Sequence, residues 1–102
     1  MRVDVVGRHF EVTDAIRQYA WNKAEKLSKF FDGLQAVTVT IQPQDHTHSP
    51  QYEVELVLDV EKHADFIAKA TGKDPYAAID LASEKGERQL RDFKEKLKQN
   101  KH

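Results

Sequence analysis

The feature that most constrains the fold is a strict alternation of apolar and polar residues in two segments near the middle of the chain. In residues 37–42, valine and isoleucine alternate with threonine and glutamine, and residues 52–61 repeat the pattern with acidic partners. This period of two is typical of a β-strand with one buried and one exposed face. Pro43 is expected to end the first of these strands. The chain therefore needs a second layer that covers one face of a sheet.

Two longer segments have the apolar period of a helix and can supply that layer. The first is expected over residues 14–31, with Thr13 as its N-cap. The second is expected from residue 75 to about 98, where Asp74 and the proline that follows it form a strong start signal. Gly86 falls on the apolar stripe of this helix, which indicates a close approach to the sheet or to the other helix.

Weaker strand patterns at residues 3–6 and 65–70, the latter stopped by Gly72, complete the order β-α-β-β-β-α. The first two strands, joined through a helix, are expected to be parallel, and the remaining strands to form an antiparallel meander. The prediction is an α+β two-layer sandwich: a four-stranded mixed sheet with two helices on one face, like a double-stranded-RNA-binding domain. Residues 1–102 make a single domain, with a basic C-terminal tail from about residue 98.

The formal net charge of −1 hides an uneven distribution along the chain. Residues 1–84 hold 9 Lys and Arg against 14 Asp and Glu, whereas residues 85–102 hold 7 against 3. The two parts therefore carry −5 and +4. We expect folding to sort these charges to opposite sides of the domain, and a basic pole of this kind favours a polyanionic partner.

Several classes of function lack the residues they need. The chain has no cysteine for a disulfide, a thiolate zinc site or a nucleophile. No apolar run approaches the roughly 20 residues of a membrane-spanning helix, and no signal peptide is visible, so we expect a cytoplasmic protein without membrane contact. Nucleophile motifs and Gly-rich phosphate loops are missing, so we expect no enzyme and no cofactor. His46 and His48, beside Asp45, leave a small metal-dependent enzyme as the weakest alternative.

The face of the sheet away from the helices is expected to be acidic and to repel phosphate. Since it also lacks the exposed aromatics of sheet-type RNA readers, a polyanion would meet the helices instead. In a second interpretation, the helical bases only pair with neighbouring acids on a solvated surface. The domain would then be a protein-binding regulatory module without RNA contact, using Trp21 or an open strand edge. The expected acids of the open face are Asp4, Glu53, Glu55, Asp59 and Glu61.

Two stretches of this sequence carry a family resemblance. The first is EVTDAIRQY at residues 11–19, continued by Lys23, Lys26-Leu27 and Phe31-Asp32. The second is DPYAAIDL at residues 74–81, followed by Lys85, by Glu87-Arg88-Gln89-Leu90-Arg91 and by Lys94. These stretches resemble the two helices of ribosome hibernation promoting factors and ribosome-associated inhibitor proteins, the sigma-54 modulation protein family. The resemblance covers nearly the whole chain and weakens between about residues 42 and 63.

The resemblance implies a non-catalytic protein that binds the small ribosomal subunit and its ribosomal RNA near the decoding centre. There it would block tRNA and mRNA binding and silence translation in stress or stationary phase. The length is similar to that of the family's short form, which implies a monomer off the ribosome and a separate factor for any pairing of ribosomes. Basic side chains on both helices make the family's RNA contacts. At the matching positions these are Arg17, Lys23, Lys26, Lys85, Arg88, Arg91 and Lys94.

Overall fold

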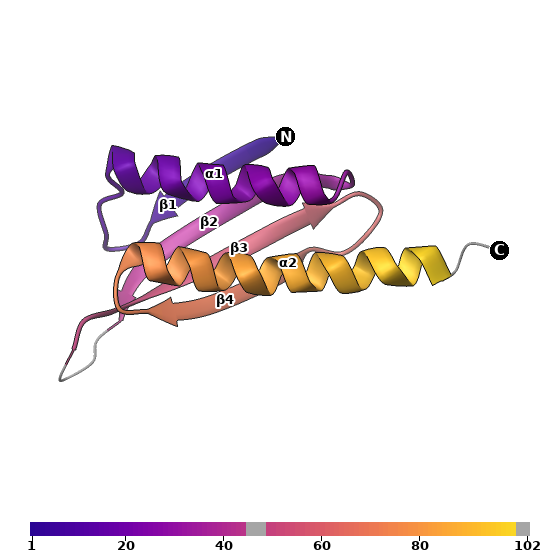
Figure 1. The fold of residues 1–102 in the computed structure, drawn as a ribbon. Helices are drawn as coiled ribbons and strands as arrows, with labels where there is room; N and C mark the ends of the chain where they lie inside the picture. The colour runs from indigo at the N-terminus through magenta and orange to yellow at the C-terminus, as the bar shows by residue number, and fades with distance from the viewer. Residues whose placement is uncertain (45–48, 100–102) are drawn as a thin grey trace.

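A computed structural model describes residues 1–44 and 49–99 of the chain (Figure 1). Its elements are β1 (Arg2–Gly7), α1 (Asp14–Phe30), β2 (Leu34–Gln44), β3 (Gln51–Val60), β4 (Phe66–Gly72) and α2 (Pro75–Gln99). The strands lie in the order β1-β2-β3-β4, with β1 parallel to β2 and the other pairs antiparallel. Both helices cover the same face of the sheet (Figure 1). The predicted α+β two-layer sandwich is therefore confirmed.

The core lies between the sheet and the two helices. Alternate residues of the strands point into it, and Ile41, Val54 and Leu58 are fully buried there. Helix α1 packs on β1 and β2, α2 packs on β3 and β4, and the helices also contact each other. Small residues on the buried sides of the helices, such as Ala24 and Ala82, allow this close packing.

The helices begin at the predicted caps. The Thr13 hydroxyl accepts a hydrogen bond from the backbone N–H of Ile16 at 3.2 Å, and the Asp74 carboxylate accepts one from Ala77 at 2.8 Å. Each bond satisfies a backbone donor that has no partner within its own helix. The caps therefore fix where each helix starts above the sheet.

Gly86 confirms the expected close approach of α2 to the sheet. A Cβ atom at this position would lie 3.2 Å from Leu58 Cδ1 and 3.7 Å from Leu56 Cδ1, both on β3. It would also lie 3.8 Å from Leu27 Cδ1 on α1. The glycine thus sits where α2, α1 and β3 meet.

Pro43 does not end β2, contrary to the prediction. The strand continues to Gln44, and Pro43 pairs with Tyr52 of β3. Strand β1 pairs with β2 only as far as Ile41, so beyond that residue β2 has a sheet neighbour on one side alone. A proline is tolerated there because its missing N–H removes no bond from the remaining ladder.

The start of β2 also differs from the prediction. The strand begins at Leu34, and its pairing register with β3 shifts between Leu34 and Ala36. Such a bulge interrupts the alternation of inward and outward side chains. The pattern of residues 37–42 therefore marks only the regular part of a longer strand.

The open face of the sheet is less acidic than expected. Glu53, Glu55 and Asp59 do alternate with the buried residues of β3, but Glu61 lies in the turn beyond the strand. Basic side chains balance part of this charge. Arg2 pairs with Asp4 at 3.3 Å, and Lys69 pairs with Glu55 at 3.6 Å. The face is consequently mixed in charge rather than purely anionic.

Candidate functional site

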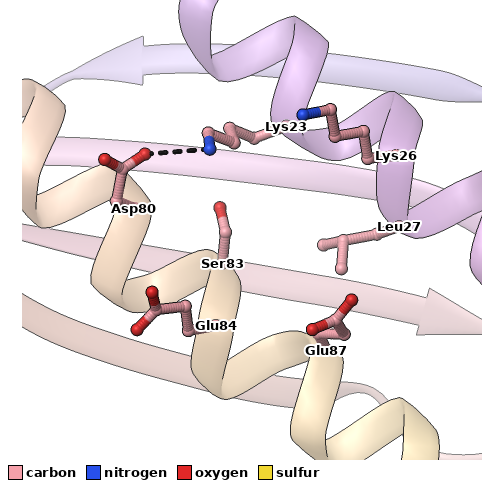
Figure 2. Close-up of a pocket in the computed structure, with 7 residues that line it drawn as sticks. All are labelled: Lys23, Lys26, Leu27, Asp80, Ser83, Glu84 and Glu87. Carbon is pink, nitrogen blue, oxygen red and sulfur yellow. Dashed lines mark ion pairs between the residues drawn. The ribbon is translucent and has the colours of Figure 1, made fainter.

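A groove of about 220 Å³ runs between α1 and α2 on the side of the helices away from the sheet (Figure 2). Side chains reach into it from both helices, with lysines contributed by α1 and mostly acidic residues by α2. Its floor includes Leu27, which is buried. The lining residues are Lys23, Lys26, Leu27, Asp80, Ser83, Glu84 and Glu87.

Asp80 joins the two helices at one end of this groove. Its carboxylate accepts a hydrogen bond from the Tyr19 hydroxyl at 2.6 Å and forms an ion pair with Lys23 at 3.1 Å (Figure 2). The Tyr19 ring packs edge-on against Tyr76, with ring centroids 5.0 Å apart, and the Lys23 ammonium lies 5.4 Å from the Tyr19 ring centre. The lysine is therefore held at a defined place on the rim of the groove.

This contact shifts the pKa of both acidic partners. The hydrogen bond from Tyr19 lowers the pKa of Asp80 from its ordinary value, and the nearby Lys23 adds to this although partial burial opposes it. The same hydrogen bond, together with burial and the charge of Asp80, raises the pKa of Tyr19. At neutral pH, Asp80 is thus an anion and Tyr19 keeps its proton.

Two of the seven predicted contact residues line the groove, and two more lie further along α2. Lys23 and Lys26 line it from α1. On α2, Arg91 pairs with the groove residue Glu87 at 3.2 Å. Lys94 donates a hydrogen bond to the backbone oxygen of Phe30, at the end of α1, at 3.2 Å. The fold therefore brings cations from both helices to the same surface.

The other three predicted residues lie elsewhere on the helical layer. Arg17 donates to the backbone oxygen of Val5 at 3.1 Å, on the β1 side of α1. Lys85 donates to the backbone oxygen of Lys69 at 2.8 Å, at the β4 edge of the sheet, and Arg88 is exposed on α2. The set thus spans the domain from one sheet edge to the other instead of forming a single stripe.

The charges are also less cleanly separated than expected. Glu84 and Glu87 line the groove beside the lysines of α1. Along α2, residues spaced by three or four lie on neighbouring turns of one side, so acids and bases alternate there. The helical layer therefore holds cations interrupted by carboxylates, and the expected sorting into two poles is only partial.

Comparison with solved structures shows that this arrangement of helices and strands is shared. A ribosomal subunit interface protein from Coxiella burnetii superposes with a TM-score of 0.79 over 92% of this chain and 98% of that protein, at 19% identity. The N-terminal domain of Thermus thermophilus Protein Y superposes with a TM-score of 0.78 over 91% and 99%, at 29% identity. The fold of the domain is therefore that of a ribosomal subunit interface protein.

A family model assigns the sequence more directly. Residues 3–98 match the model described as Sigma 54 modulation protein / S30EA ribosomal protein. This chain belongs to that family. The ribosome hibernation promoting factor of Escherichia coli (strain K12) is 36% identical over 98% of this chain and 100% of its own length. The ribosome hibernation promotion factor of Lactococcus lactis is 35% identical over 95% of this chain but only 51% of its own length.

The family assignment confirms the expected regulatory, non-enzymatic class, since the curated relatives are ribosome hibernation factors. Within residues 1–44 and 49–99, no set of three His, Cys, Asp or Glu side chains is placed to hold a metal ion. The His46 and His48 pair lies outside the described residues. None of the helices in the described part is long and apolar enough to cross a membrane.

Sequence analysis did not single out Asp80 and Ser83, two of the residues that line the groove. Asp80 links the helices, and Ser83 is buried with its hydroxyl pointing into the groove (Figure 2). The Ser83 oxygen has no hydrogen-bond partner among the described residues. The helical period places both positions beside the apolar Ile79 and Ala82, so a polar residue there signals a polar group at the helix–helix contact.

Proposed function

We propose that this protein is a ribosome hibernation factor. It binds the small ribosomal subunit near the decoding centre through ribosomal RNA, blocks the entry of tRNA and mRNA, and so silences translation in stress or stationary phase. Family membership and the names of the relatives support the link to the ribosome. The observation that carries the RNA-binding mode is that Lys23 and Lys26 line one groove between the two helices. Further along α2, Arg91 pairs with the groove residue Glu87, and Lys94 bonds to the end of α1.

The mechanism needs binding but no chemistry. Cationic side chains neutralise RNA phosphates and release the counterions that those phosphates had bound, which makes the affinity depend strongly on salt. A rigid domain seated at the decoding centre then excludes the tRNA and mRNA by occupying their place. The proposed RNA contacts are Arg17, Lys23, Lys26, Lys85, Arg88, Arg91 and Lys94.

The test is co-sedimentation of the protein with purified small subunits over a range of salt concentrations. We expect the logarithm of affinity to fall steeply with the logarithm of salt, by about 0.7 to 0.9 for each phosphate contact. Lys26→Glu and Arg88→Glu should each weaken binding and reduce this slope. Arg2→Glu is the matched control, because Arg2 lies on the open face of the sheet with its side chain 76% exposed.

The proposal is wrong if the protein does not pellet with small subunits at low salt. It is also wrong if the two helical variants and the control bind alike. A protein-binding module would instead lose its partner in Trp21→Ala, because Trp21 is 41% exposed beside Arg17 and Gln18, and would be indifferent to the charge reversals. A translation assay with added tRNA and mRNA measures the proposed block directly.

The proposal further holds that the domain acts as a monomer and that pairing of ribosomes needs a separate factor.

A further inference from the structure

A second hollow lies at the other end of α2, away from the groove. It has a volume of about 500 Å³ and is formed between the last turns of α2 and the start of β4. In Figure 1, the C-terminal turns of α2 extend past the ends of the strands. The lining residues are His63, Phe66, Gln89, Asp92, Phe93, Lys96 and Leu97.

The walls of this hollow are aromatic rings in a layered arrangement. The His63 ring stacks on Phe66 at a centroid distance of 4.6 Å and an angle of 11°, and lies 4.5 Å from Phe93. Phe66 and Phe93 are half-buried, whereas His63 is exposed and Leu97 is 47% exposed. Because the three rings pack on one another, the surface they offer to the hollow is mainly that of the exposed His63 ring, with Leu97 as an exposed aliphatic side chain beside it.

The rim of the hollow is polar and charged. Asp92 and Lys96 are exposed there and supply a hydrogen-bond acceptor and a cation. The amide of Gln89 donates to the backbone oxygen of Ile67 at 2.9 Å, but its own oxygen is buried without a partner in the described part of the chain. A ligand with a flat apolar face, a hydrogen-bonding edge and a nearby negative charge matches all of these groups.

We propose that this hollow binds one unpaired nucleobase of ribosomal RNA. The inference deepens the proposed function and rests on it. An unstacked base has a π-face for the exposed His63 ring and an edge for Asp92, and its phosphate would lie near Lys96. Successive members of the series Lys85, Gln89, Asp92 and Lys96 are three or four residues apart, so they lie along one side of α2. The RNA would therefore continue from the Lys85 contact to the hollow.

Stacking and phosphate contacts have different signatures in a salt titration. Removing a stacking surface lowers affinity at every salt concentration, by about 5- to 150-fold for one base, but leaves the number of released counterions unchanged. We therefore expect His63→Ala to bind small subunits more weakly with an unchanged salt slope. Leu97→Ala, which removes the aliphatic part of the hollow at an exposed position, should do the same if His63→Ala were to disturb the turn.

Ile67→Ala serves as the control, since Ile67 is 53% exposed and lies on the face of β4 opposite to Phe66. A photo-crosslinking residue at position 97, on small subunits, identifies the occupant: we expect crosslinks to ribosomal RNA. The inference is overturned if both hollow variants bind like the control, or if the crosslinks go to a ribosomal protein. Those results leave the proposed function standing as long as the lysine and arginine reversals still reduce the salt slope. Failure of the wild-type protein to bind at all would instead remove the proposed function.

Discussion

At the scale of single residues, the contact between Tyr19 and Asp80 links the folding of the domain to pH. Asp80 has a lowered pKa in the folded protein, chiefly because the Tyr19 hydroxyl donates to it. The unfolded chain therefore binds a proton at Asp80 more readily, with the ordinary pKa of 3.8. The contact stabilises the fold fully above that value, and its contribution is lost as the pH falls through the lower, folded-state pKa.

Tyr19→Phe should remove this contribution. We expect a loss of about 1 kcal/mol in the free energy of unfolding at pH 7, at the low end for a bond to a charged group because the Asp80 side chain is 41% exposed. The difference from wild type should shrink as the pH falls below about 4. Urea unfolding at several pH values measures it, with Tyr76→Phe as the control. An equal difference at pH 7 and at pH 2 would contradict this account.

At the scale of elements, Gly86 sets how closely α2 lies on the sheet. Gly86→Ala gains about 1 kcal/mol of helix propensity, but the new Cβ meets Leu58 Cδ1 at 3.2 Å in a fully buried position. We expect these effects to offset, leaving the stability within about 1 kcal/mol of wild type. Gly86→Val should lose about 2 kcal/mol or more.

The measurement is the urea midpoint of the two variants. The controls are Glu95→Ala and Glu95→Val, because Glu95 is exposed and the difference between its two variants reports helix propensity alone. If Gly86→Val were no worse than Glu95→Val, the close packing inferred for α2 would be wrong.

The elements themselves were largely predictable, because each depends on local periodicity and caps. Thr13 and Asp74 marked the helix starts, and the alternating residues marked the regular parts of the strands. The ends of β2 were not predictable in the same way. The bulge near Leu34 and the one-sided pairing at Pro43 depend on where β1 and β3 lie, which is a property of the assembled sheet.

At the scale of the whole molecule, the acids of α2 oppose the binding that its bases promote. Glu84 and Glu87 line the groove, and Glu87 also holds Arg91 in an ion pair. Glu87→Gln should therefore raise the affinity for small subunits by a factor of about five, as the loss of about 1 kcal/mol of charge repulsion near water would give. Equilibrium binding at fixed salt measures this, with Asp59→Asn on the open face as the control. Weaker binding of Glu87→Gln would show that the ion pair positions Arg91 for its contact.

The site was less predictable than the fold. Residue spacing identified bases on both helices, and the structure places Lys23 and Lys26 in one groove between them. Residue spacing could not show that Asp80 and Glu87 would share that surface, because the contact of α1 with α2 joins residues about 60 positions apart. The apolar stripe of α2 also did not show that the helix extends past the ends of the strands and that Leu97 is exposed there.

The separation of the two helices along the chain has a consequence for synthesis. The groove needs α1 and the middle of α2, and three strands separate these helices in the sequence. Chains emerge from the translating ribosome with the N-terminus first, so one wall of the groove appears long before the other. A growing chain therefore has no complete groove while most of α2 is still unmade. On the proposed function, the factor gains its activity only after α2 has been made, so it cannot act on the ribosome that is still producing that helix.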